Sequence, residues 1–233
     1  MMRIAVPRSA VLFTSLCVAP LLAPVGAQGR TIDEGVFVVT RRGAPTQTES
    51  FRIARMADDL YQATGQLVSG DERASSTMMA DSIGTPVAYG FVHKTRGATT
   101  AEVRALAGGG RLSLKSSDTR GNETMRDFPV AAGQCVLLDD DMMHQLFFVV
   151  RARRAAGVPF QVIVPGRAQR ESAVLTPHGL ESVEVAGRSV TATHYSLVSG
   201  LTVRQFWADA AGRLLRVEIP GLGLTAIRED LPQ

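Results

Sequence analysis

Three consecutive aspartates and a nearby histidine are the side chains of this sequence best suited to chemistry. Asp139, Asp140 and Asp141 precede His144 by a few positions. Paired carboxylates hydrolyse glycosidic bonds, and a carboxylate beside a histidine is a general acid–base pair. Three adjacent residues point in different directions, however, and no separate partner acid stands out. We therefore expect these residues to begin a helix, with one aspartate capping its free amides. A hydrolase that uses one of these acids with His144 is the less favoured alternative.

Other patterns with known chemistry do not combine into a site. The four histidines (His93, His144, His178 and His194) lack metal-ligand spacing, and no paired-cysteine or calcium-loop motif occurs. Methionine pairs at 78–79 and 142–143 are typical of core filling rather than of a copper site. Gly108–Gly110 lacks the lysine and helix of a phosphate loop, so it predicts a hairpin turn. We predict no catalytic residue, no metal and no cofactor, and hence a protein that is not an enzyme.

The first 27 residues have the three-part pattern of a secretory signal peptide. Arg3 and Arg8 are followed by an apolar run over residues 10–22 and by Val25–Gly26–Ala27, small residues suited to signal peptidase. Prolines interrupt the run, which is also too short for a membrane span. We expect cleavage near Ala27, a periplasmic or secreted location, and a single domain over residues 28–233. Cys135 is then the one remaining cysteine, so no intramolecular disulfide forms.

Charge argues against a nucleic-acid partner. The chain has 25 basic and 22 acidic residues. Removal of the signal leaves 23 basic against 22 acidic residues, a net charge of +1. Basic and aromatic residues are not interleaved, so this surface has no preference for nucleic acid or for anionic lipid.

Alternation of polar and apolar residues predicts strands along most of the chain. The pattern recurs in Arg111–Lys115, Val87–His93 and Leu215–Ile219, and glycine-containing turns separate the runs. Val203–Ala208 and Leu214–Ile219 predict a hairpin, which a final strand over Leu224–Arg228 follows. We predict a mainly β fold: a long curved antiparallel meander of about a dozen strands, a half-open barrel.

One segment departs from this period. Residues 142–150 carry an apolar stripe at helical spacing, with acids before them and arginines after them, as the helix dipole favours. A buried strand is the alternative reading for Phe147–Val150. We expect one central helix packed on the sheet, with a hinge near residues 151–157.

Aromatic residues supply the candidate binding surface. The concave side of a curled sheet must be filled by a helix, by packed side chains or by an apolar ligand. We take Phe51, Tyr89, Phe91, Phe147 and Trp207 as candidate ligand-binding residues, and a plain packed core is the alternative for each of them.

Two stretches carry a resemblance to known proteins. The segment Thr202–Ile219, with a Trp-x-Asp and a following Gly-Arg-Leu, resembles the hairpin of uncharacterised secreted bacterial domains of unknown function. Residues 137–141 with His144–Gln145 are similar to their middle section. Those domains are similar in shape to the periplasmic lipoprotein-localisation carriers. The resemblance implies a curled sheet with an apolar concave face and no catalytic machinery.

Three functions follow, in order of preference. The first is an exported, non-enzymatic protein that binds an apolar or amphipathic ligand, such as a lipid or acyl chain, on the concave face. The second is a structural or protein-interaction module of the envelope, with an envelope protein as partner. The third is the hydrolase.

Overall fold

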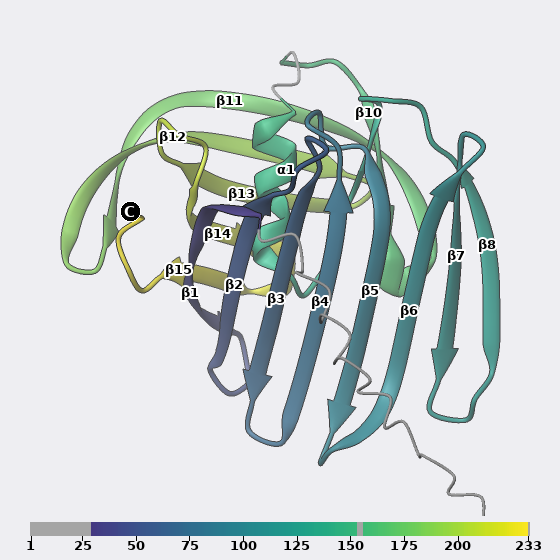
Figure 1. The fold of residues 1–233 in the computed structure, drawn as a ribbon. Helices are drawn as coiled ribbons and strands as arrows, with labels where there is room; N and C mark the ends of the chain where they lie inside the picture. Colours follow the sequence, from purple (N-terminus) through teal and green to yellow (C-terminus); the bar gives the residue numbers. More distant parts are fainter. Residues whose placement is uncertain (1–28, 153–155, 233) are drawn as a thin grey trace, which may run out of the picture.

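A computed structural model describes residues 29–152 and 156–232, and the strands in these ranges form one sheet (Figure 1). The predicted signal peptide lies outside the described residues. The strands are β1 (Arg30–Arg41), β2 (Gln47–Arg55), β3 (Tyr61–Ser69), β4 (Glu72–Ala80), β5 (Pro86–Thr95), β6 (Ala98–Gly108), β7 (Arg111–Asp118), β8 (Glu123–Pro129), β9 (Cys135–Leu137), β10 (Phe160–Val164), β11 (Gln169–Val185), β12 (Arg188–Ser199), β13 (Thr202–Ala208), β14 (Leu214–Ile219) and β15 (Leu224–Arg228).

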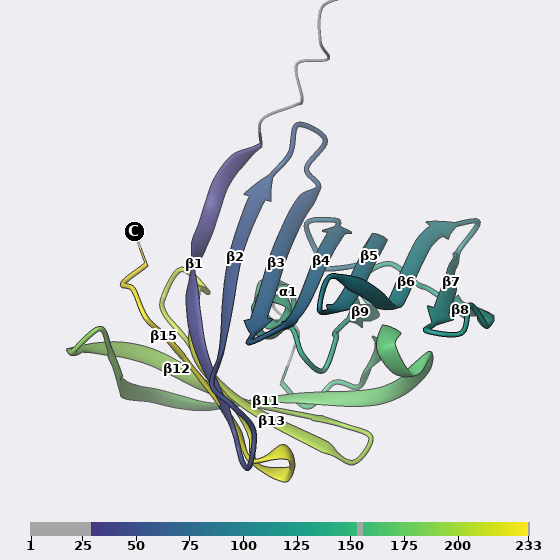
Figure 2. The ribbon, with the colours of Figure 1, turned by 90° about the horizontal axis from the view of Figure 1, so that it is seen from below.

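The sheet has two arms, one of β1 to β8 and one of β9 to β15, which meet at its middle. Its strand order is β8-β7-β6-β5-β4-β3-β2-β1-β15-β14-β13-β12-β11-β10-β9. Neighbours pair antiparallel, except that β9 and β10 are parallel. Figure 2 shows the arms diverging from the β1–β15 junction as two walls. The predicted curved, open meander is confirmed, and the described residues form 15 strands rather than about a dozen.

Local turn chemistry explains the hairpins. Gly109 and Gly110 have φ values of 58° and 74° between β6 and β7. Positive φ at both central residues defines the tight turn that suits twisted strands, so the glycines here make a turn, as expected. The predicted final hairpin is confirmed as β13 and β14, and β15 has the predicted bounds.

The segment between the arms runs through the space that they enclose. After β9 come a 3-10 helix, η1 (Met143–Gln145), and helix α1 (Leu146–Arg151), and α1 lies between the walls in Figure 2. Two more 3-10 turns are η2 (Pro165–Arg167) and η3 (Pro220–Leu222). The predicted helix is confirmed, but the predicted aspartate cap is wrong, because neither η1 nor α1 has a side-chain cap.

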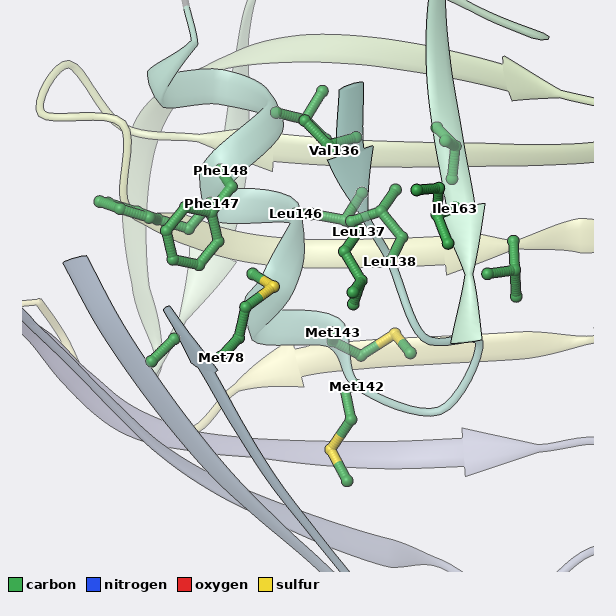
Figure 3. Packing of buried hydrophobic residues seen from close by; sticks show 14 of the residues in the cluster. Met78, Val136, Leu137, Leu138, Met142, Met143, Leu146, Phe147, Phe148 and Ile163 are labelled. Atoms are coloured by element: carbon green, nitrogen blue, oxygen red, sulfur yellow. The ribbon is translucent and has the colours of Figure 1, made fainter. Parts of the chain in front are cut away.

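The main core fills the inner side of the curved sheet. Buried side chains from both arms pack around residues 135–149, and Figure 3 shows Phe147 and Met143 among them. A second, smaller core of Val183, Val185, Ala192, Trp207 and Leu215 forms apart from it. Adjacent residues of β13, Phe206 and Trp207, belong to different cores, because successive strand side chains point to opposite faces.

The join between the two halves of the sheet is the β1–β15 pairing. The predicted hinge near residues 151–157 includes residues 153–155, which lie outside the described residues. In the ranges that the structure describes, no helix is long and apolar enough to cross a membrane.

Candidate functional site

The stretch from β9 to α1, residues 135–151, is called the central segment here. Its three aspartates anchor it to distant parts of the sheet. Asp139 Oδ2 accepts a hydrogen bond of 2.8 Å from the Tyr89 hydroxyl on β5. Asp141 Oδ1 lies 2.8 Å from Arg41 on β1. Asp140 Oδ1 lies 2.6 Å from Arg204, which β13 contributes. These contacts replace the predicted helix cap: the side chains do point in different directions, and each one meets a different strand.

A fourth anchor is a buried hydrogen-bonded pair. Glu49 on β2 and His144 in η1 are both fully buried, with Glu49 Oε1 2.5 Å from His144 Nδ1. The same carboxylate accepts the backbone N–H groups of Met143 (2.9 Å) and His144 (3.2 Å). His144 Nε2 has no hydrogen-bond partner among the described residues. A carboxylate with three donors is well satisfied, so this pair fixes η1 against β2.

Gly65 on β3 makes room for the histidine ring. A Cβ atom added at Gly65 would lie 2.3 Å from His144 Cε1, closer than any real contact. The ring of Phe51 stacks on His144, with 6.0 Å between centroids. His144 is therefore held between β2 and β3 within the core, where it acts as a packing and anchoring group rather than as an exposed acid–base residue.

Burial changes the acidity of Asp139, the carboxyl group that is anchored to β5 through Tyr89. It raises the pKa of Asp139 from 3.8 to about 6, although the hydrogen bond from Tyr89 opposes the shift. Burial and the neighbouring carboxylate raise the pKa of the Tyr89 hydroxyl well above its ordinary value. The Asp139–Tyr89 pair is thus a buried structural contact whose charge depends on pH.

Most of the predicted binding residues lie in the filled interior. Phe51, Tyr89, Phe91 and Phe147 belong to the main core, and each is less than a tenth exposed. The protein's own central segment packs next to them, as Figure 3 shows, and the space left beside Phe147 is a hollow of about 200 Å³. Trp207 belongs to the second core, so the structure does not bring it together with the other four.

Trp207 is covered on both faces. His194 stacks on its ring, with 4.4 Å between centroids, and the Arg216 guanidinium lies 5.2 Å from its centroid. The indole N–H donates to Glu181 Oε2 (2.8 Å), and Glu181 Oε1 lies 2.8 Å from His194 Nδ1. The Trp207 and His194 hydrogen bonds lower the pKa of Glu181. This group fixes the long β11–β12 hairpin and leaves little of the indole for a ligand.

An open hollow occurs on the outer face of the sheet instead. Its volume is about 550 Å³, and it lies over β4 to β7. Ala88 and Gly90 alternate with the buried Tyr89 and Phe91 along β5, so they face outward and form its floor. Its other lining residues include Met79, Leu106, Arg104 and Lys115.

One pattern in the sequence indicates where this hollow lies. Along Val87–His93 the large residues share one face and the small residues share the other. Small outward residues beside Leu106, which is 66% exposed, leave an apolar depression on a face that is otherwise polar. The five aromatic residues lie in the two cores instead, as large apolar side chains most often do.

Comparison with solved structures identifies the class of fold, a β-barrel-like sheet. The chain is similar to a β-barrel-like protein of the domain of unknown function DUF1849 from Brucella abortus. The TM-score is 0.58 at 12% identity, covering 86% of this chain and 97% of that chain. A DUF1089 family protein from Pseudomonas aeruginosa has a TM-score of 0.41 at 14% identity, covering 78% and 93% of the two chains.

Searches with protein-family models and among curated proteins give no match. In the part of the chain that the structure describes, no three His, Cys, Asp or Glu side chains gather in a way that could hold a metal ion.

Proposed function

We propose that this protein is a non-enzymatic binding protein for an apolar or amphipathic ligand, such as a lipid or acyl chain, and that the ligand occupies the outer hollow over β4 to β7. The observation that carries the proposal is the contrast between an inner face that the central segment largely fills and this larger hollow of about 550 Å³. Ala88, Met79 and Leu106 give it an apolar surface. Each methylene that a ligand buries there contributes roughly 0.8 kcal/mol, so an alkyl chain binds without a specific polar contact.

Support for a binding role comes from the contacts of the side chains best suited to catalysis. His144 and the three aspartates serve as anchors of the central segment, so they are engaged in structure. A hollow with an apolar floor and charged side chains at one side is typical of a site for an amphipathic molecule. The N-terminal signal pattern supports a periplasmic or secreted location, which sequencing the N-terminus of the exported protein would test.

Two measurements test this function. Lipid extraction of the purified protein followed by mass spectrometry should recover an amphiphile. Titration with dodecyl maltoside below its micelle concentration should show binding to the wild-type protein, and Leu106→Glu should weaken it by about tenfold or more, because a charge then replaces an apolar wall.

A matched variant controls for surface charge. Leu180 on β11 is 74% exposed and lies away from the hollow. Leu180→Glu should therefore bind the probe as the wild type does. A protein that carries no amphiphile, and whose probe binding is the same in both variants, would end the proposal.

A second function, an envelope protein-interaction module, has one observation in its favour. β8 is an end strand of the sheet, and all of its residues except Phe128 are exposed. An open strand edge can pair with an extended segment of a partner. Met125→Pro would remove a backbone donor from this edge, because the register places the Met125 N–H on the side of β8 away from β7. Loss of one stoichiometric partner from a pull-down would favour this module over ligand binding.

A further inference from the structure

The outer hollow continues into a charged one. A second hollow of about 260 Å³ lies over β6 to β8. Arg104 and Lys115 line both hollows, so the two are continuous on the outer face. The apolar part thus ends at two cations, beyond which the lining includes Glu102 and Glu123.

Strand register orders this chemistry into three rows. Residues two apart on a strand share a face, and directly paired residues lie side by side. Successive rows are therefore about 7 Å apart along the strands. The rows, in order, are Met79–Ala88–Leu106, Gly90–Arg104–Lys115 and Glu102–Ser117–Glu123.

The middle row places two cations directly opposite each other. Arg104 on β6 pairs in register with Lys115 on β7, an arrangement that is unfavourable without an anion nearby. Glu102 lies 2.5 Å from Arg104, and Glu123 lies 2.7 Å from Lys115, so each cation takes a carboxylate of the third row. Arg104 and the whole of the Lys115–Glu123 pair are exposed, whereas Glu102 is partly buried, and ion pairs at the surface contribute little free energy. A charged ligand can therefore exchange partners with them at little cost.

One further carboxylate lies near the hollow. Asp127 on β8 follows Ser113 in the row of Leu106, and its Oδ1 accepts a hydrogen bond of 2.7 Å from the Ser113 hydroxyl. It lies at the β8 end of the apolar row, beyond the lining of the main hollow. The order across the remaining lining is apolar, then cationic, then anionic.

We propose, building on the binding function above, that the ligand is a zwitterionic amphiphile with its anionic group next to the tail and its ammonium group farthest away. The alkyl tail lies over Ala88 and Leu106. A phosphate group lies between Arg104 and Lys115, and the ammonium group lies near Glu102 and Glu123. This order leaves every charge compensated, so the head group selects the ligand by orientation more than by added affinity.

Two probes with opposite head-group order test the proposal. Dodecylphosphocholine has phosphate beside the tail, whereas dodecyl sulfobetaine has ammonium beside the tail and sulfonate at the end. Both have the same chain length and no net charge. We expect calorimetric titration below the micelle concentrations to show about tenfold tighter binding of dodecylphosphocholine.

The charged rows supply the matched variants. Arg104→Gln combined with Lys115→Gln should bring the ratio of the two affinities close to one while both probes still bind. Arg170→Gln combined with Arg188→Gln removes two exposed arginines on β11 and β12 and should keep the ratio. Phosphocholine without a tail should bind far more weakly than the amphiphile.

The outcomes separate this inference from the proposed function. Equal affinity of the two probes, each weakened by Leu106→Glu, would overturn the head-group order and leave the binding function standing. If neither probe binds, or if Leu106→Glu does not weaken their binding, both the head-group order and the binding function are overturned. Tight binding of tailless phosphocholine would contradict the amphiphile and point to a soluble ligand.

Discussion

The inner and outer faces of β3 to β5 are formed by alternate residues of the same strands, but they are covered in different ways. On the inner face, Gly65 lies directly against the ring of His144, and the central segment leaves no room for a Cβ. On the outer face, Gly90 has no atom within 4 Å of an added Cβ. One glycine is required by a close approach, whereas the other leaves open space.

The charges on the two faces differ in the same way. Glu49 and His144 are fully buried, and the carboxylate accepts three hydrogen bonds from η1. Arg104 and Lys115 are at least half exposed and hold single carboxylates. Buried pairs are costly to break, whereas exposed pairs exchange readily. The comparison indicates that the inner polar pair holds the fold and that the outer charges are available to a ligand.

Removal of Glu49 should give the largest effect. Glu49→Ala leaves His144 Nδ1 and two backbone N–H groups without an acceptor inside the core. Loss of one partner of a buried pair costs about 3–5 kcal/mol of unfolding free energy. Urea unfolding followed by circular dichroism measures it.

An exposed glutamate provides the control for that variant. Glu184→Ala on β11 should change the unfolding free energy by less than about 0.5 kcal/mol. A Glu49→Ala protein as stable as the Glu184→Ala protein would show that the pair does not hold the central segment.

Asp139 gives the inner face a pH dependence. Burial raises its pKa from 3.8 to about 6, so the native state holds the proton more tightly than the unfolded chain. Its stabilising contribution is therefore fully present below about pH 4 and is lost as pH rises through about 6. Between these limits the wild type should lose up to about 3 kcal/mol relative to Asp139→Asn, which keeps an acceptor for Tyr89.

Unfolding of both proteins at several pH values measures this difference. The stability of Asp139→Asn subtracted from that of the wild type should fall steadily between about pH 4 and 7. A difference that stays constant, or that rises with pH, would contradict a raised pKa at this buried carboxyl.

The fold could be predicted further than the site, and particular residues show why. Period-two alternation and glycine turns are local signals, so the meander and the bounds of β15 (Leu224–Arg228) follow from the sequence. The partners of Asp139 and Asp140 lie 50 and 64 residues away in the chain, on β5 and β13. Such pairings depend on how the sheet curls, which no local pattern contains.

The helix cap failed for a related reason. Aspartates before an apolar run are typical of an N-cap, and that local preference is worth about 1 kcal/mol. Here Arg41 and Arg204 compete for the carboxylates, and charged hydrogen bonds are stronger than neutral ones. Tertiary contacts therefore determined where the side chains point.

Gly65→Ala should disturb the inner face by a smaller amount. The new Cβ would lie 2.3 Å from His144 Cε1, so the ring or strand β3 must move. Overpacking of this kind costs about 1–3 kcal/mol. In a His144→Ala background the clash is absent, and the added cost of Gly65→Ala should nearly vanish, because contacting residues are not additive. Equal costs in the two backgrounds would show that the ring does not lie against Gly65.

Gly90→Ala should give the smallest effect, and one of opposite sign. The added Cβ meets nothing, and the φ of Gly90 is not positive, so the native backbone accepts alanine. Loss of unfolded-state freedom should then stabilise the protein by about 0.4–1 kcal/mol. Because that methyl group enters the floor of the outer hollow, Gly90→Ala should also weaken dodecyl maltoside binding, and Gly90→Leu should weaken it more. Stability that rises while binding falls would separate the two faces as a ligand surface and a structural core. A destabilised Gly90→Ala protein would instead show that the outer face is as tightly constrained as the inner one.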